Sequence, residues 1–321
     1  MSLPSNPLHV ADRSVSRVIN QKAIIDKIYC ADGISKAQIA KELGISKPAV
    51  TSNVADLIAI GLVEEVGEGE AAKSGGRKPM ILRFNESHSY IGALDLSLSE
   101  PVCAVCDLKY NMIGVRKILI GQKSSADERK QCVIDTFTGI LADKGLPPGR
   151  LGIIVISQPG IIEAATGAHY ANERHHGWTE IGLGRYLQNE LGIPVHVRND
   201  VNMAAMGEVH FGMEENPCDL FYVSCGIGLG AGLVLGGKLH EGGSGAAGEI
   251  GEVQMSDGSK AEDVIAMSGL IERVTAISNG AGRPDEVSFQ YIVEKANEND
   301  PAVNRAIFET GIDLGRIIYN C

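Results

Sequence analysis

The fold of the N-terminal region is decided by the stretch from Ile34 to Leu62, ISKAQIAKELGISKPAVTSNVADLIAIGL. Ser35 and Gln38 have the spacing of a capping box, in which two orphan amides at the start of a helix are satisfied reciprocally. Gly44 predicts the turn that follows, because glycine adopts a positive φ at no steric cost. Ser46 is then expected to cap a second helix. The stretch therefore predicts a helix, a turn and a second helix.

The second helix has one apolar face and one polar face. Its apolar side chains recur at helical spacing and predict a buried stripe: Val50, Val54, Leu57 and Ile58. The remaining side chains are small, polar or cationic and are expected to face outward with Ser46: Lys47, Thr51, Ser52 and Asn53. Such side chains suit the phosphates and base edges of a DNA major groove. An ordinary helical hairpin with a solvated face is the alternative.

The residues that follow predict a β-hairpin, which completes a winged helix-turn-helix. Its strands are expected at Leu62–Val66 and Met80–Phe84, with a loop rich in glycine and charge between them. Arg77 and Lys78 lie near the tip of this wing and are expected to contact DNA. Lys36, on the first helix of the pair, either contacts a phosphate or is a solvated lysine.

The net charge of the 321-residue chain is −11, and it is unevenly distributed. Residues 1–84 carry 11 Lys and Arg against 9 Asp and Glu, whereas the remainder carries 18 against 31. An acidic remainder repels DNA, so docking through one face is favoured. The sequence has no apolar run near 18 residues and no signal-peptide pattern, and its seven scattered cysteines are typical of a reducing compartment. A cytoplasmic protein without a membrane span is predicted.

From Tyr90 the pattern changes to alternating strands and helices. Three strands are predicted first, at Tyr90–Leu98, Pro101–Leu108 and Met112–Ile120, and then a helix at Ala126–Lys144. The wholly apolar run Leu151–Ile156 predicts a strand that is covered on both faces. A helix at Ile181–Leu191 precedes a second buried strand, Pro194–Arg198, and a new hairpin starts at Leu220. This order fits a duplicated, actin-like (ribonuclease H-like) α/β fold.

Four segments follow from this organisation. Residues 1–13 are expected to be disordered or loosely attached, 14–86 to form the winged helix-turn-helix, 87–200 the first actin-like lobe and 201–321 the second.

Several motifs, taken in their order and spacing, resemble the ROK family of repressors, open reading frames and kinases. The likeness is to its transcription-factor branch, which includes the N-acetylglucosamine and xylose repressors. It runs from about Arg17 to the C-terminus and is carried by Arg17-Val-Ile-Asn20, Gly75-Gly-Arg-Lys-Pro79, Ser157-Gln-Pro-Gly160, Trp178, Val197-Arg-Asn-Asp200, Gly226-Ile-Gly-Leu-Gly230 and Ala247-Gly-Glu-Ile-Gly251. The resemblance implies a sugar-kinase-like fold behind the DNA-binding module.

The resemblance also implies a sugar site. In family kinases an Asp that follows an Asn takes a proton from a sugar hydroxyl, and Asn199 and Asp200 occupy these places. A carboxylate with an amide suits a vicinal diol, although Asn-Asp is also a favoured turn dipeptide. Glu249 matches the family's sugar-binding Glu, and Gly160 and Asn172 are further sugar contacts in the family pattern.

The family's zinc site is predicted to be absent. Glu252 replaces the expected His, and residues 257–269, where the family has a cysteine cluster, contain neither Cys nor His. Glu272 corresponds to a further sugar-contacting Glu, but both Glu252 and Glu272 equally allow a solvent-facing position. Carboxylates gathered at one site repel unless they are protonated or meet a cationic ligand such as a hexosamine.

Two loops that cradle phosphate in family kinases are altered. The first, Asp95-Leu-Ser-Leu-Ser99, lacks the glycine that lets the backbone approach a phosphate, and the second, Gly226-Ile-Gly228, lacks the threonine hydroxyl. Phosphoryl transfer depends on positioning and charge stabilisation, so these losses predict a protein that is not an enzyme and uses no cofactor.

We therefore predict a sugar-responsive DNA-binding transcriptional regulator, a repressor of carbohydrate uptake or catabolism genes that binds a DNA operator as a homodimer. The alternatives are a ROK-type sugar kinase with an accessory DNA-binding domain and a DNA-binding protein whose sugar site has decayed. The chain stops at Cys321 inside a predicted helix, where family members continue, so the second lobe is expected to be incomplete.

Overall fold

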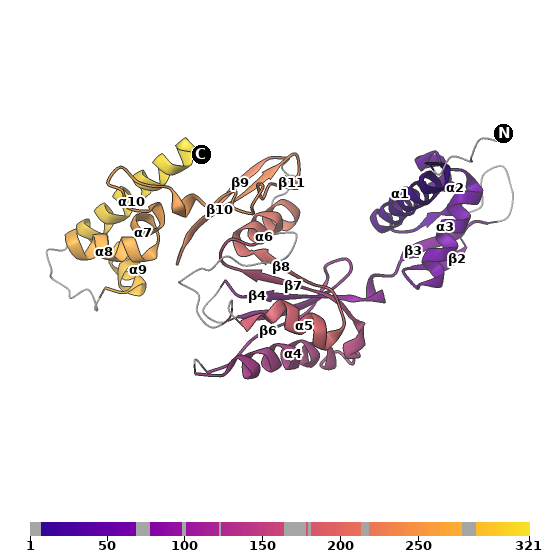
Figure 1. The fold of residues 1–321 in the computed structure, drawn as a ribbon, viewed down its shortest axis with the longest axis horizontal. Coiled ribbons are helices and arrows are strands. Elements are labelled where there is room, and N and C mark those ends of the chain that lie inside the picture. Colours follow the sequence, from indigo (N-terminus) through magenta and orange to yellow (C-terminus); the bar gives the residue numbers. More distant parts are fainter. Residues whose placement is uncertain are drawn as a thin grey trace, which may run out of the picture. The chain divides into compact units, whose positions relative to one another are not determined.

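The computed structural model describes residues 8–68, 78–97, 101–121, 123–163, 178, 181–212, 218–277 and 287–321. The chain divides into two compact units. Unit 1 comprises residues 1–92, 104–115 and 138–152, and unit 2 comprises residues 93–103, 116–137 and 153–321. Figure 1 shows the helices and strands of both units.

The N-terminal part of unit 1 is a winged helix-turn-helix, as predicted. Its elements are α1 (Leu8–Cys30), β1 (Ile34–Ser35), α2 (Lys36–Leu43), α3 (Lys47–Ala59), β2 (Val63–Glu68) and β3 (Met80–Phe84), and its strands lie in the order β1-β3-β2. Helix α1 begins at Leu8, so residues 8–13, which lie in the segment expected to be disordered or loosely attached, belong to this helix. The Ser35–Gln38 capping box is confirmed, and Gly44 ends α2 with a φ of 65°.

Helix α3 differs from the prediction at two positions. Ser46 is its N-cap, but its side chain makes no capping hydrogen bond. The prediction that Asn53 faces outward is wrong, because the side chain is 5% exposed and its Nδ2 donates to the Ala49 carbonyl at 2.8 Å. Asn53 follows Val50 by three residues and precedes Leu57 by four, and this spacing places all three on the buried face.

The core of the winged module joins α1, α2 and α3 to the hairpin. Its fully buried side chains are aliphatic and include Ile24, Ile28, Ile39, Val50, Val54 and Leu82. Burial of such side chains stabilises the module by about 1.5–3 kcal/mol each relative to exposure. The module therefore has a hydrophobic core of its own.

The tip of the β5–β6 hairpin contacts the winged module within unit 1. Leu108 packs against the core of the module, and its amide donates to the Glu86 carbonyl at 3.0 Å. Lys109 Nζ lies 5.7 Å from the ring centroid of Tyr29, which is a cation–π distance. The guanidinium of Arg150 donates to the carbonyls of Ser87, at 3.3 Å, and His88, at 2.9 Å. We call these contacts the joint.

A five-stranded sheet follows, in the order β6-β5-β4-β7-β8. Its strands are β4 (Tyr90–Asp95), β5 (Val102–Asp107), β6 (Met112–Lys117), β7 (Leu151–Gln158) and β8 (Val195–Asn199). Strands β7 and β8 are parallel, and Gln158 pairs with Asn199 where both strands end. Helices α4 (Ala126–Ala142) and α5 (Leu183–Leu191) lie along one side of the sheet (Figure 1), and Lys130 of α4 lies 5.0 Å from the ring centroid of Tyr186 of α5.

The rest of unit 2 combines a second sheet with a group of helices. Helix α6 (Asp200–Gly207) packs against β9 (Leu220–Cys225) and β10 (Leu229–Leu235), and β11 (Lys238–Leu239) extends this antiparallel sheet. The helices that follow are α7 (Ala261–Ile265), α8 (Met267–Ile277), α9 (Phe289–Asn297) and α10 (Pro301–Asn320). Each strand and helix predicted from the sequence is present within a few residues. The incompleteness of the second lobe stays a prediction.

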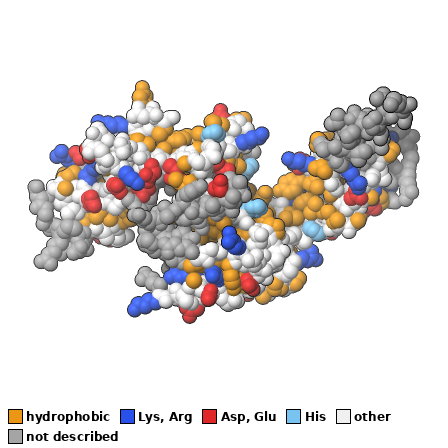
Figure 2. Space-filling view, viewed as in Figure 1, with side chains coloured by type: hydrophobic (Ala, Val, Ile, Leu, Met, Phe, Trp, Pro, Cys, Tyr) orange, Lys and Arg blue, Asp and Glu red, His pale blue; other side chains and the backbone are white. Residues whose placement is uncertain are grey.

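Within the described part of the chain, none of the helices combines the length and apolar character needed to cross a bilayer. On the face drawn in Figure 2, Asp and Glu side chains are spread over unit 2.

Candidate functional site

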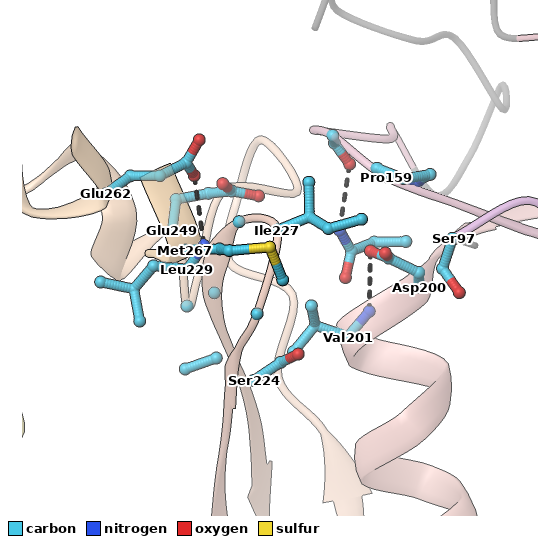
Figure 3. Close-up of a pocket in the computed structure, with 17 residues that line it drawn as sticks. Ser97, Pro159, Asp200, Val201, Ser224, Ile227, Leu229, Glu249, Glu262 and Met267 are labelled. Atoms are coloured by element: carbon cyan, nitrogen blue, oxygen red, sulfur yellow. Dashed lines mark hydrogen bonds between the residues drawn. The ribbon is translucent and has the colours of Figure 1, made fainter. Parts of the chain in front are cut away.

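A cavity of about 390 Å³ in unit 2 lies where the end of β8 faces the turn between β9 and β10. We call it the primary cavity, and Figure 3 shows its lining. The lining residues are Ser97, Pro159, Gly160, Asn199, Asp200, Val201, Ser224, Gly226, Ile227, Gly228, Leu229, Gly230, Ala231, Gly248, Glu249, Glu262 and Met267. Four residues of the predicted sugar site, Gly160, Asn199, Asp200 and Glu249, are thereby brought together.

Asn199 and Asp200 stand at the junction of β8 and α6. Asn199 is 9% exposed and caps α6, because its Oδ1 accepts a hydrogen bond from the Asn202 amide at 2.8 Å. Its Nδ2 donates to the Gly160 carbonyl at 3.1 Å. Asp200 is the first residue of α6, where the helix dipole favours a negative charge. Asn199 is thus a capping residue that also positions Gly160, and the Asp200 carboxylate faces the cavity.

Glu249 reaches the cavity because Gly248 approaches β10 closely. Gly248 has a φ of +87°, its carbonyl accepts from the Ala231 amide at 2.7 Å, and a Cβ at this position would clash with the Ala231 carbonyl. Burial raises the pKa of Glu249 to about 7, with further contributions from the charges of Asp200, Glu252 and Glu262. Near neutral pH this carboxyl group can therefore either donate or accept a hydrogen bond.

Glu262 is a cavity residue that the sequence does not reveal. It lies on α7, and its Oε2 accepts a hydrogen bond from the Leu229 amide at 3.3 Å (Figure 3). No periodicity or spacing points to this contact, because it depends on how α7 folds back onto the β9–β10 turn. Together Asp200, Glu249 and Glu262 give the cavity an acidic lining.

The other predicted sugar contacts lie elsewhere. Glu252 does not line the cavity, since its side chain is 58% exposed and pairs with Lys260 at 2.7 Å, which agrees with the solvent-facing alternative. Glu272 lines a neighbouring cavity rather than the primary one. Asn172 falls outside the described residues.

The turn Gly226–Gly228 is held by three hydrogen bonds. The Gly226 amide donates to the Gly228 carbonyl at 2.9 Å, and the Gly226 carbonyl accepts from the Met267 amide at 2.8 Å. The Leu229 amide is directed at the Glu262 carboxylate, and Ile227 stands 50% exposed on the turn. A carboxylate beside this turn repels a phosphate, so the arrangement favours a neutral polyol or a cationic ligand.

The family's zinc ion does not fit the residues present at its positions. Glu252 is ion-paired with Lys260 where the family has a His ligand, and residues 257–269 offer no Cys or His. Among the described residues, no cluster of three or more His, Cys, Asp or Glu side chains has a metal-holding arrangement. The absence of the zinc stays a prediction.

The candidate DNA interface is the outer face of α2, α3 and the wing. Its exposed members are Ser46, Lys47, Thr51, Ser52 and Lys78. The Thr51 hydroxyl donates to the Lys47 carbonyl at 2.9 Å, and Lys36 Nζ pairs with Glu65 Oε1 at 2.9 Å. Asn53 is buried, and Arg77 falls outside the described residues. Contact between these side chains and DNA stays a prediction.

Two family models match the chain. The model of the ROK family matches residues 91–321, and a model described as a winged helix-turn-helix DNA-binding domain matches residues 19–64.

Similar proteins include repressors and regulators from bacteria. The xylose repressor of Bacillus spizizenii is 27% identical over 313 residues, which cover 96% of this chain and 80% of that protein. The DNA-binding transcriptional dual regulator NagC of Escherichia coli is 22% identical over 330 residues, which cover 98% of this chain and 80% of that one.

Among solved structures, a ROK family transcriptional regulator described as a homologue of the Escherichia coli MLC protein superposes with a TM-score of 0.75. It is 25% identical, and the superposition covers 94% of this chain and 80% of that one. A ROK hexokinase from Thermus thermophilus superposes with a TM-score of 0.57 at 20% identity, over 72% of this chain and 78% of that one. The sugar-kinase-like fold expected from the motifs is thereby confirmed.

Proposed function

Because this chain belongs to the ROK family and carries a winged helix-turn-helix, we propose that it is a sugar-responsive transcriptional repressor of carbohydrate uptake or catabolism genes. The observation that carries the proposal is the primary cavity, which gathers Gly160, Asn199, Asp200 and Glu249 on a chain with a DNA-binding module. The names of the similar xylose repressor and of NagC support a regulator rather than a sugar enzyme.

The sugar binds in the primary cavity through its hydroxyl groups. Asp200 and Glu262 accept hydrogen bonds from hydroxyls, and Glu249 donates or accepts according to its protonation. A sugar that binds one arrangement of the lobes more tightly shifts the population toward it, with a coupling of about 1–3 kcal/mol. In a dimer, two winged modules must match half-sites about one DNA turn apart, so a modest change of spacing weakens operator binding.

Sugar phosphorylation is the second candidate, because Asp200 keeps the position of the family kinase base and lines the cavity. The Leu229 amide, however, is directed at Glu262, and Ile227 replaces a hydroxyl donor on the turn. We therefore infer that the protein does not turn over ATP. Phosphorylation of any hexose or hexosamine that is lost on Asp200→Asn would overturn this inference.

The test of the proposed function measures DNA binding and its response to sugar. Fluorescence anisotropy with a labelled fragment of the protein's own promoter region is expected to show saturable binding that weakens when the correct sugar is added. Lys47→Ala should weaken binding to DNA without changing the affinity for sugar. Asp200→Asn should weaken binding to sugar without changing the affinity for DNA. A protein that binds no such fragment at moderate salt contradicts the proposal.

A further inference from the structure

A second cavity, of about 540 Å³, opens beside the primary cavity and shares part of its wall. Ile227 and Met267 line both cavities. The residues that line the second cavity alone are Asp263, Ser268, Ile271 and Glu272, and they lie on α7 and α8. The two cavities are therefore contiguous, with Ile227 and Met267 at their boundary.

This boundary is held in place by backbone hydrogen bonds. The amide of Met267, the first residue of α8, donates to the Gly226 carbonyl at 2.8 Å and ties the helix to the glycine turn. Ile227 projects from the tied turn with half of its surface exposed, and its β-branched side chain has few rotamers. In the view of Figure 3, Ile227 and Met267 lie between Glu249 and Glu262 on one side and Asp200 on the other. The boundary thus offers apolar contact at a fixed place.

The lining of the second cavity combines apolar and hydrogen-bonding groups. Ile227, Met267 and Ile271 supply aliphatic surface, and Asp263, Ser268 and Glu272 supply oxygen atoms. A sugar ring has a matching composition, since its C–H faces are apolar and its edges carry hydroxyl donors. Carboxylates accept such donors strongly, whereas a phosphate is repelled by two like charges.

We propose that the second cavity is a subsite for a second sugar unit, so that the effector is a disaccharide or a longer oligosaccharide. One unit lies at Asp200 and Glu249 in the primary cavity. The next unit lies against Ile227, Met267 and Ile271, with its hydroxyls directed at Glu272 and Ser268. The inference rests on the proposed function, because it takes the primary cavity to hold a sugar. It also gives Glu272 a sugar contact outside the primary cavity.

Isothermal titration calorimetry with matched pairs of sugars tests the subsite. The probes are xylose with xylobiose, glucose with cellobiose, and N-acetylglucosamine with N,N′-diacetylchitobiose. At least one disaccharide is expected to bind about tenfold more tightly than its monosaccharide, because its second unit buries apolar surface. The disaccharide should also release the promoter fragment at a proportionally lower concentration.

Two variants test whether the tighter binding of the disaccharide, the disaccharide advantage, arises in the second cavity. Ser268→Trp places a large side chain at an exposed position of the lining, so it should abolish the disaccharide advantage and leave monosaccharide affinity within about twofold. Ile271→Ala should reduce the advantage by about fivefold. Asn304→Trp, at an exposed position of α10 outside both cavities, is the matched control and should change neither affinity. If Ser268→Trp fails to fold, Ile271→Ala and Glu272→Gln take its place as tests of the second cavity.

The outcomes separate the two proposals. A monosaccharide that binds and releases DNA, with no disaccharide binding more tightly, overturns the subsite and leaves the proposed function standing. A disaccharide advantage that survives Ser268→Trp and Ile271→Ala also overturns the subsite. If no sugar of either size binds, the proposed function fails and the subsite fails with it.

Discussion

At the scale of single residues, the primary cavity contains a carboxyl group whose charged form is disfavoured by its surroundings. Burial of Glu249, with further contributions from the charges of Asp200, Glu252 and Glu262, raises its pKa from 4.5 to about 7. A raised carboxyl pKa means that folding disfavours the charged form. The stability that neutral Glu249 provides is complete below pH 4.5 and is lost as the pH rises through about 7.

Glu249→Gln is therefore expected to stabilise the protein at pH 8 and to leave stability almost unchanged at pH 4.5. The shift corresponds to about 1–2 kcal/mol once it is reduced for the partial solvent exposure of the group. Thermal unfolding of the unmodified protein and of the variant is measured across this pH range. The difference in stability between the two removes the contribution of all other titrating groups, because they are the same in both. Glu294→Gln, the same substitution at an exposed position of α9, is the matched control. An equal effect of Glu249→Gln at both pH values contradicts the assignment.

At the scale of elements, local patterns predicted most of the fold. Capping residues, glycine turns and apolar patterns predicted α2, α3, β3, β7 and β8, because these signals act over a few residues. The prediction that β8 is a buried strand is wrong, because β8 comes last in the strand order of its sheet and Asn199 alone among its five residues is buried. The prediction that Asn53 faces outward was wrong because it rested on the polarity of the side chain alone. Asn53 lies three residues after Val50, and this position is on the buried face of α3. Glu262 and the separate place of Glu272 could not be predicted, because they depend on how α7 and α8 pack against the β9–β10 turn.

The contact between α2 and β2 also has a consequence for DNA binding. Lys36 Nζ pairs with Glu65 Oε1 at 2.9 Å, so the carboxylate competes with a DNA phosphate for this ammonium group. Glu65→Gln is expected to raise DNA affinity about two- to fivefold at low salt, since one additional phosphate contact becomes available. Anisotropy titrations at several salt concentrations measure the change, which should shrink as salt rises.

The matched double variant Lys36→Ala with Glu65→Gln identifies the cause. It should bind DNA no more tightly than Lys36→Ala alone, because the ammonium group is gone. A gain in affinity that persists in the double variant would show that general charge, rather than release of Lys36, is responsible.

At the scale of the whole molecule, the proposed function requires that sugar binding in the primary cavity of unit 2 affects the winged module of unit 1. The joint is the described set of contacts that ties the winged module to the β5–β6 hairpin and to the turn before β7. It combines the packing of Leu108, the Lys109–Tyr29 contact and the hydrogen bonds of Arg150. Leu108 directly follows β5 and Arg150 directly precedes β7, so both residues adjoin strands of the five-stranded sheet. Strand β7 pairs with β8, which ends at Asn199.

We expect the double variant Lys109→Ala with Arg150→Ala to weaken this transmission. Neither residue lines the primary or the second cavity or lies on α3, so the separate affinities for DNA and for sugar should change by less than about twofold. The loss of DNA affinity on addition of sugar should become about two- to fivefold smaller, as part of a coupling of 1–3 kcal/mol. Anisotropy titrations with and without saturating sugar measure all three quantities. Lys144→Ala, an exposed lysine after α4 in the same unit, should leave the coupling intact. An unchanged coupling in the double variant would mean that these contacts only anchor the module, and that the signal travels by another route.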